Sequence, residues 1–100
     1  MKLARKKLVS VVAESALETT LVKEIKRLGA GGYTIVAAHG EGSRGVRKGD
    51  WDQNRNILLQ VLCAEETAHA IMAVLFEKYH DDYALIAYLS DVEVHRERKF

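Results

Sequence analysis

Apolar residues follow two kinds of pattern along the chain, and the two kinds alternate. Short runs rich in β-branched and aliphatic residues predict four β-strands. They are 8–13 (LVSVVA), 33–38 (YTIVAA), 56–63 (NILLQVLC) and 83–89 (YALIAYL). Between the first and second runs, and again between the third and fourth, apolar residues recur at helical spacing and predict helices over 15–28 and 64–79. The predicted order of elements is therefore βαββαβ.

Each predicted helix has one apolar stripe and recognisable ends. Ser15 and Glu18 fit a capping box at the start of the first helix, and Gly29 is suited to end it. The expected stripe of this helix is Leu17, Leu21, Val22, Ile25 and Leu28, and its expected solvated side is Lys23, Glu24, Lys26 and Arg27. The expected buried stripe of the second helix is Ala68, Ile71, Met72, Leu75, Phe76 and Tyr79. Segment 80–82 (HDD) is expected to end the second helix, and the charged segment 91–99 is either an edge strand or disordered.

The order of elements predicts an α+β fold, the ferredoxin-like βαββαβ sandwich. In this fold both helices cover one face of a four-stranded antiparallel sheet. The second and third strands are expected to form a hairpin. Every predicted strand carries apolar residues on both faces, so a single copy would leave an apolar sheet face exposed. The pattern therefore predicts an oligomer that packs sheet against sheet.

A long polar loop, Gly40–Gln53 (GEGSRGVRKGDWDQ), separates the second and third strands. Loops of this length are usually binding segments or disordered ones. Its glycines allow close backbone approach, and Arg44, Arg47 and Lys48 supply cations, so the composition favours binding of a phosphate or carboxylate. Trp51 either contacts a partner or folds back onto the domain. The alternative is a solvated loop that binds nothing.

Length and composition bound the possible functions. One hundred residues predict one domain over 1–100, and a net charge of +1 argues against nucleic-acid binding by bulk electrostatics. Cys63, the single cysteine, lies in an apolar strand pattern, which indicates a reducing compartment. The apolar run 8–13 is too short to cross a membrane. A cytoplasmic protein is expected.

The sequence contains little that favours catalysis, a metal or RNA. The four histidines share no motif, so no catalytic residue is expected. The trio His80, Asp81 and Asp82 is interpreted as a polar turn rather than a metal site. The RNA-recognition motif has the same element order, but its aromatic residues on the first and third strands are missing here, so no nucleic-acid partner is expected. Arg96 and Arg98 are two apart and would point the same way on a strand, either toward the loop site or as part of a solvated terminus.

Three segments together resemble a known family. They are 29–34 (GAGGYT), 40–47 (GEGSRGVR) and 78–86 (KYHDDYALI). With this spacing the chain resembles the PII signalling superfamily over nearly its whole length. It is most similar to the SbtB type of cyanobacteria and the related carboxysome-associated PII-like regulators of inorganic carbon uptake. By this resemblance the loop at about 40–53 is the T-loop, and 78–86 contains the B-loop.

The resemblance implies a homotrimer with adenine nucleotides in the clefts between subunits. AMP, ADP, ATP or cyclic AMP would bind, together with bicarbonate in the carboxysome-associated group, and no prosthetic group is implied. The implied nucleotide-binding residues are Gly40, Gly42, Ser43, Arg44 and Arg47 of one subunit and Asp82, Tyr83, Ala84, Leu85 and Ile86 of its neighbour, with Arg96 and Arg98 near the terminal phosphate.

The resemblance also implies a protein partner. The T-loop, with Val46, Lys48 and Trp51, would dock onto a membrane bicarbonate transporter or a carboxysome-related protein and recruit the cytoplasmic protein to the inner face of the membrane.

Some features depart from the family pattern, and other functions stay open. Leu85 stands where SbtB-like B-loops usually have glycine. The loop lacks the tyrosine that classical PII proteins uridylylate, which argues against nitrogen signalling by that route. Redox control through the Cys-containing C-terminal extension of many SbtB proteins is not expected. The alternatives are an ACT-like or copper-tolerance-like module that binds a small molecule or metal, a weak nucleotide phosphohydrolase, and a pure interaction protein.

Overall fold

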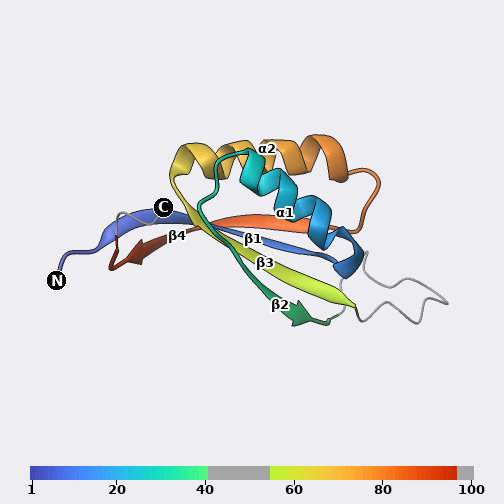
Figure 1. Cartoon of the computed structure of the whole chain (residues 1–100), viewed down its shortest axis with the longest axis horizontal. Coiled ribbons are helices and arrows are strands. Elements are labelled where there is room, and N and C mark those ends of the chain that lie inside the picture. The colour runs from blue at the N-terminus through green and yellow to red at the C-terminus, as the bar shows by residue number, and fades with distance from the viewer. Residues whose placement is uncertain (41–54, 97–100) are drawn as a thin grey trace.

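The computed structural model describes residues 1–40 and 55–96. Its elements are β1 (Ala4–Glu14), the short 3-10 helix η1 (Ser15–Leu17), α1 (Glu18–Arg27), β2 (Thr34–Ala38), β3 (Asn56–Cys63), α2 (Glu65–Tyr79) and β4 (Ile86–Val94). The strands form one antiparallel sheet in the order β2-β3-β1-β4, and both helices lie on the same side of it (Figure 1). The predicted α+β ferredoxin-like arrangement is confirmed, as is the pairing of β2 with β3.

The core lies between the helices and the sheet. Every second residue of β3 points into it, and Ile57, Leu59, Val61 and Cys63 are all buried, as predicted. The other buried members of the core cluster are Val9, Val11, Ala13, Leu17, Leu21, Ile25, Ala68, Ile71, Leu75 and Tyr79. The prediction that Phe76 is buried was wrong. Phe76 is 66% exposed, and its ring lies 4.7 Å from that of His80, so it contacts the end of α2 rather than the core.

Two strands are displaced or longer than their apolar patterns predicted. β1 begins at Ala4 rather than at Leu8, and β4 runs over Ile86–Val94 rather than 83–89. The reason is cross-strand pairing. Lys7 lies opposite Asp91, with 2.6 Å between Nζ and Oδ1, and Arg5 lies opposite Glu93. Opposite charges placed across two strands stabilise segments that look like solvated tails when each is considered alone.

The ends of α1 contain one wrong prediction and one confirmed one. No side chain caps the start of α1. The backbone N–H of Ser15 donates to the carbonyl of Arg55 at 2.8 Å, so the predicted capping box is not formed. The end is as expected: Gly29 has φ +101°, and the N–H groups of Gly29 and Ala30 donate to the carbonyls of Lys26 and Ile25. This is the Schellman arrangement, which favours glycine at the left-handed position.

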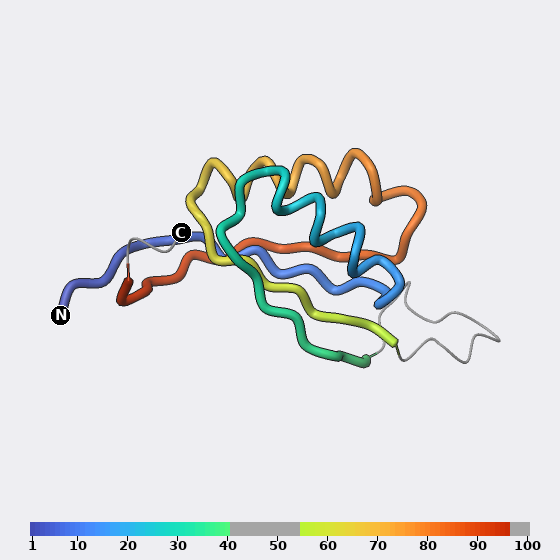
Figure 2. Tube along the Cα trace, viewed as in Figure 1, coloured from blue at the N-terminus to red at the C-terminus, as the bar shows by residue number. Residues whose placement is uncertain are grey.

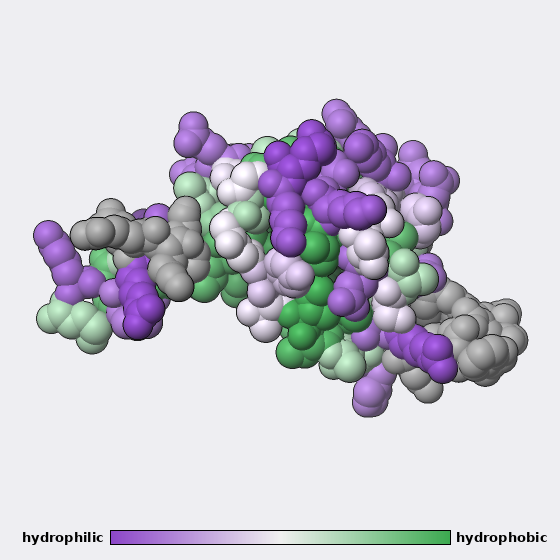
Figure 3. Space-filling model, in the orientation of Figure 1, coloured by the Kyte–Doolittle hydropathy of each residue, from purple (hydrophilic) through white to green (hydrophobic). Residues whose placement is uncertain are grey.

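The sheet face opposite the helices is open and largely apolar. One row crosses all four strands and consists of Val36, Leu58, Val12 and Ile86. Beside it, Ser10 is buried between Gln60 and Tyr88, and the Gln60 amide donates to Ser10 Oγ at 3.3 Å. Hydrophilic residues cover most of the outer surface of the helices, whereas hydrophobic ones reach the surface along β2 (Figure 3). None of the helices in the described part of the chain is long and apolar enough to cross a membrane.

Candidate functional site

Two candidate binding segments lie at the same end of the sheet. Gly40 follows β2, Arg55 precedes β3, and the turn 80–85 leads into β4. The strand register fixes their positions, since Ala38 lies opposite Asn56 at one edge and Ile86 lies opposite Val12 at the other. The Cα trace shows the end of β2, the start of β3 and the turn before β4 at the same end of the sheet, far from the N-terminus (Figure 2). The fold therefore brings the start of the predicted T-loop and the predicted B-loop to one end of the molecule.

The same topology keeps these two segments apart within one chain. β2 and β4 are the two edge strands, so three strand spacings of about 4.8 Å, or about 14 Å in total, separate Val36 from Ile86. A phosphate oxygen contacts donors at about 3 Å. At this level of the sheet, one phosphate group therefore cannot contact both edge strands of a single chain. The β2 edge of one copy placed beside the β4 edge of another would bring Gly40 and the turn 80–85 together.

The B-loop turn is anchored at both of its ends and exposed between them. Tyr79 is buried, its ring lies 5.6 Å from that of Tyr83, and the Tyr83 N–H donates to the Tyr79 carbonyl at 3.2 Å. Burial raises the pKa of the Tyr79 phenol, which keeps it protonated. At the other end Leu85 packs against the core. This packing role gives a reason for leucine at a position where the resembling proteins have glycine. Between these anchors, Asp82 and Tyr83 are exposed and Ala84 is half-buried.

Ile86 opens β4 and is 62% exposed on the open sheet face. Tyr33 is 43% exposed, Tyr88 is 48% exposed and Tyr83 is 37% exposed. Each lies on an edge strand, beside one, or in a turn, where a single chain has no second layer to cover it.

The base of the T-loop is only partly described. Gly40 is exposed, and a Cβ at this position would meet nothing within 4 Å. The returning end of the loop is held by the hydrogen bond from Ser15 N–H to the Arg55 carbonyl. The other predicted loop residues lie outside the described residues; they are Gly42, Ser43, Arg44, Val46, Arg47, Lys48 and Trp51.

Arg96, the described member of the predicted arginine pair, is not brought to this end. Arg96 follows β4, which runs from Ile86 to Val94 and so carries the chain about 26 Å away from the B-loop. Within one chain Arg96 therefore lies at the opposite end of the sheet from Gly40. Arg98 lies outside the described residues.

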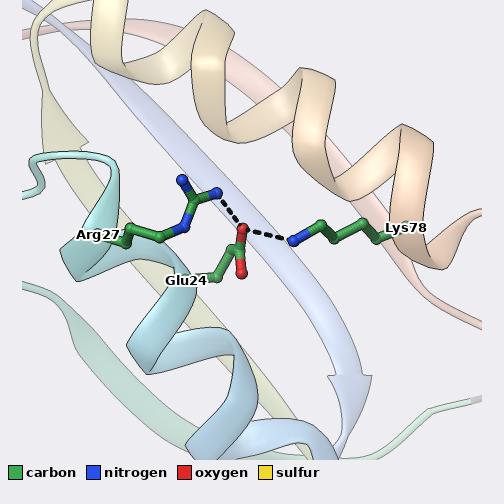
Figure 4. A network of polar contacts seen from close by, with 3 residues as sticks. All are labelled: Glu24, Arg27 and Lys78. Carbon is green, nitrogen blue, oxygen red and sulfur yellow. Dashed lines mark hydrogen bonds and ion pairs between the residues drawn. The ribbon is translucent and has the colours of Figure 1, made fainter.

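One charged group that contacts the end of α2, Glu24, was not identified as a candidate from the sequence. Glu24 of α1 was assigned to the solvated side, but only 12% of its side chain is exposed, and the carboxylate contacts both Arg27 of α1 and Lys78 of α2 (Figure 4). The hydrogen bond from Arg27, and then that from Lys78, hold the pKa of Glu24 below its ordinary value of about 4.5. Lys78 lies 54 residues further along the chain, so helical periodicity could not indicate this contact.

The remaining candidates for chemistry in the described part of the chain are metal-ligating side chains and the thiol of Cys63. Residues 1–40 and 55–96 contain no cluster of three or more His, Cys, Asp or Glu side chains that could hold a metal ion. Cys63 is buried, and burial raises the pKa of its thiol, which disfavours the reactive thiolate.

Comparisons with known proteins agree with this arrangement of fold and loops. The family described as Nitrogen regulatory protein P-II matches residues 6–99. The structure of a PII-like signalling protein from Thermus thermophilus is 47% identical, with a TM-score of 0.79 over 94% of this chain and 92% of that one. Two structures of CPII from Thiomonas intermedia are also similar. One, bound to ADP, AMP and acetate, is 25% identical, with a TM-score of 0.86 over 100% of this chain and 98% of that one. The other, bound to ADP and bicarbonate, is 26% identical, with a TM-score of 0.84 over 99% and 97%.

The family match spans most of the chain, and it agrees with the antiparallel sheet and the two helices on one face. The resemblance seen in the sequence is thereby confirmed at the level of the superfamily. The chain belongs to the P-II family of regulatory proteins.

Proposed function

We propose that this protein is a non-catalytic PII-like regulator that binds adenine nucleotides between the subunits of a trimer. One observation carries the proposal. The proposed T-loop base and B-loop lie at the same end of the sheet but on opposite edges, so the two segments come together when the β2 edge of one copy meets the β4 edge of the next. A similar protein, CPII, is known bound to ADP together with AMP or bicarbonate. Adenine nucleotides are accordingly the proposed ligands, with bicarbonate as a second one.

A closed ring of copies would both complete the nucleotide site and cover the open face of the sheet. In a ring, one edge of each subunit meets the other edge of the next, so every T-loop base has a neighbouring B-loop. The open apolar row from Val36 to Ile86 would be buried toward the interior of such a ring. Burial of this row also removes an apolar face that a monomer would leave in water.

The proposed roles of the residues follow from their chemistry. Backbone N–H groups of the turn 82–86, apart from that of Tyr83, which donates to the Tyr79 carbonyl, would donate to phosphate oxygens of one nucleotide. Gly40, Gly42 and Ser43 would approach the same phosphates from the next subunit, and Arg44 and Arg47 would add charge-assisted hydrogen bonds. Arg96 and Arg98 would need the tail of a further subunit to take part, because β4 carries Arg96 away from the turn.

Ligand occupancy would regulate a partner through the loop 40–53. A ligand shifts a conformational equilibrium only if it binds the two loop states with different affinity, and phosphate contacts at the loop base provide such a difference. Val46, Lys48 and Trp51 would then contact the partner. We propose a cytoplasmic regulator of inorganic carbon uptake, of the SbtB or carboxysome-associated type, whose partner is a membrane bicarbonate transporter or a carboxysome-related protein.

Isothermal calorimetry tests the proposal. AMP, ADP, ATP and cyclic AMP are titrated separately into the purified protein, each with and without bicarbonate. We expect one site per chain for at least one nucleotide, and an Arg44→Ala/Arg47→Ala variant that binds it more weakly by about 2–5 kcal/mol. A variant at Lys23, on the outer surface of α1, serves as the charge control. Absence of binding by all four nucleotides would refute the proposal, and unchanged affinity of the double variant would remove the loop from the site.

A further inference from the structure

The last turn of α2 leads directly into the candidate B-loop, and its position is fixed by contacts from both sides. Tyr79, the last residue of α2, is buried in the core, and Tyr83 is joined to it by a ring contact and a backbone hydrogen bond. The outer side of the same turn carries Lys78, whose ammonium group lies 3.3 Å from Glu24 Oε2 of α1. This ion pair joins the two helices through polar side chains.

The surroundings of Glu24 distinguish this link from a pair in which both side chains are largely exposed. Its side chain is only 12% exposed, whereas those of Arg27 and Lys78 are 57% and 54% exposed. A carboxylate that has lost most of its water needs its cationic partners, so its position constrains them. Arg27 comes from the same helix, three residues away, and can hold the carboxylate in place without involving α2. Lys78 is the partner that transmits this constraint to the other helix (Figure 4).

We propose that Glu24 is a positioning residue for nucleotide binding: from α1 it holds Lys78, and through Lys78 it fixes the turn that runs from Tyr79 to Ile86. Glu24 does not touch the ligand in this proposal. It reduces the number of conformations that the turn must lose when its backbone N–H groups meet a phosphate. This inference rests on the proposed function, because it assumes that the turn forms part of the nucleotide site.

The test uses single and double variants of the full-length chain. Glu24→Gln removes the charge and keeps the shape, and Lys78→Gln removes the link from the α2 side. The matched control is Arg27→Gln, which deprives the same carboxylate of its other cation but leaves the link between the helices. Circular dichroism first establishes that each variant is folded. If Glu24→Gln does not fold, Lys78→Gln still tests the link, because its side chain is largely exposed and Glu24 keeps Arg27.

The first readout needs no ligand. The Tyr83 amide hydrogen bond to the Tyr79 carbonyl reports directly on the turn, and its hydrogen exchange can be followed by NMR. We expect Glu24→Gln and Lys78→Gln each to speed exchange at Tyr83 by about two- to fivefold, with the double variant no faster than either one. Arg27→Gln should leave this exchange rate unchanged. Equal acceleration at all amides, or an effect of Arg27→Gln as large as that of Glu24→Gln, would show a purely structural role and overturn the inference.

The second readout is ADP affinity by calorimetry. Glu24→Gln and Lys78→Gln should each weaken ADP by about threefold or more, again without adding in the double variant. Weaker binding in Lys78→Gln with unchanged binding in Glu24→Gln would mean that Lys78 contacts the ligand itself, which overturns the inference. Wild-type protein that binds no nucleotide would overturn the proposed function instead, and the exchange measurement would then still decide whether Glu24 holds the turn.

Discussion

On the helix side of the sheet, Val9, Leu59 and Val61 have no exposed surface, whereas on the opposite side Val36 keeps 48% of its surface exposed and Ile86 keeps 62%. The residues are of the same type, although the buried ones lie on the central strands β1 and β3 and the exposed ones on the edge strands β2 and β4. Leu58 and Leu59 are direct neighbours in β3 that point to opposite faces. The two faces therefore differ in what covers them, and one chain supplies a cover for only one of them.

This difference separates two roles of apolar residues. Those facing the helices stabilise the fold of each chain, because their burial is complete before any second copy is present. Those on the open face gain little from folding alone and can gain more from association. The contribution of the helix-side residues to the free energy of unfolding should therefore be independent of protein concentration. The contribution of the open-face residues should depend on protein concentration, because it requires association.

The largest expected effect comes from the helix side. Leu59→Ala should lower the free energy of unfolding by about 2–5 kcal/mol, because it leaves a cavity in a core position with no exposed surface. Leu58→Ala is the matched control on the open face. Urea unfolding of both variants at several protein concentrations measures the difference. Equal losses for both variants, independent of concentration, would contradict the separation of the two faces.

A charge on the open face should break the assembly and spare the fold. Val36→Glu places a carboxylate in the apolar row, and burying it there without a partner should weaken association by about 1–3 kcal/mol per subunit. Light scattering after gel filtration should then show the 11.2 kDa chain in place of a trimer, with unchanged circular dichroism. Ala73→Glu, at an exposed position of α2, is the control. Wild-type protein that is already a monomer would refute the proposed ring.

Patterns along one segment predicted most of the fold. The bounds of β3 came out as predicted, Asn56–Cys63, because this apolar run has polar or charged residues close to both of its ends. The errors arose where a second segment decides the structure. β1 extends to Ala4 because Lys7 meets Asp91 on β4, and the helical wheel placed Glu24 in solvent because it cannot show Lys78.

The residues of the candidate site were predicted from family resemblance rather than from the pattern of apolar residues. The turn 82–86 and Gly40 were identified by resemblance, and the topology then brought them to one end of the sheet. The distance between them across the sheet could not be predicted from the sequence, because it depends on the strand order. The same holds for Arg96, which β4 carries to the opposite end.

A smaller effect concerns the backbone at the end of α1, on the helix side of the molecule. Gly29 has φ +101°, and a Cβ there would meet nothing within 4 Å, so Gly29→Ala should lower stability by about 1–2 kcal/mol through backbone strain alone. Gly32→Ala is the matched control, since Gly32 has equal space and no positive φ. Thermal unfolding compares the two. Equal melting temperatures would indicate that the end of α1 does not constrain the chain.

The smallest effect should be visible mainly through its pH dependence. Partners hold the pKa of Glu24 below about 4.5, so its ionised form stabilises the folded chain above that pH, and this contribution is lost as the pH falls through the lower folded value. Ion pairs between residues three apart on a helix typically contribute about 0.2–0.5 kcal/mol. Glu24→Gln should therefore be slightly less stable than wild type at neutral pH, and the difference should vanish in acid. Urea unfolding of both proteins from about pH 7 to pH 3 measures this convergence. A difference that stays constant into acid would assign the effect to packing rather than to charge, and the same series on Val36→Ala, on the open face, should show no convergence.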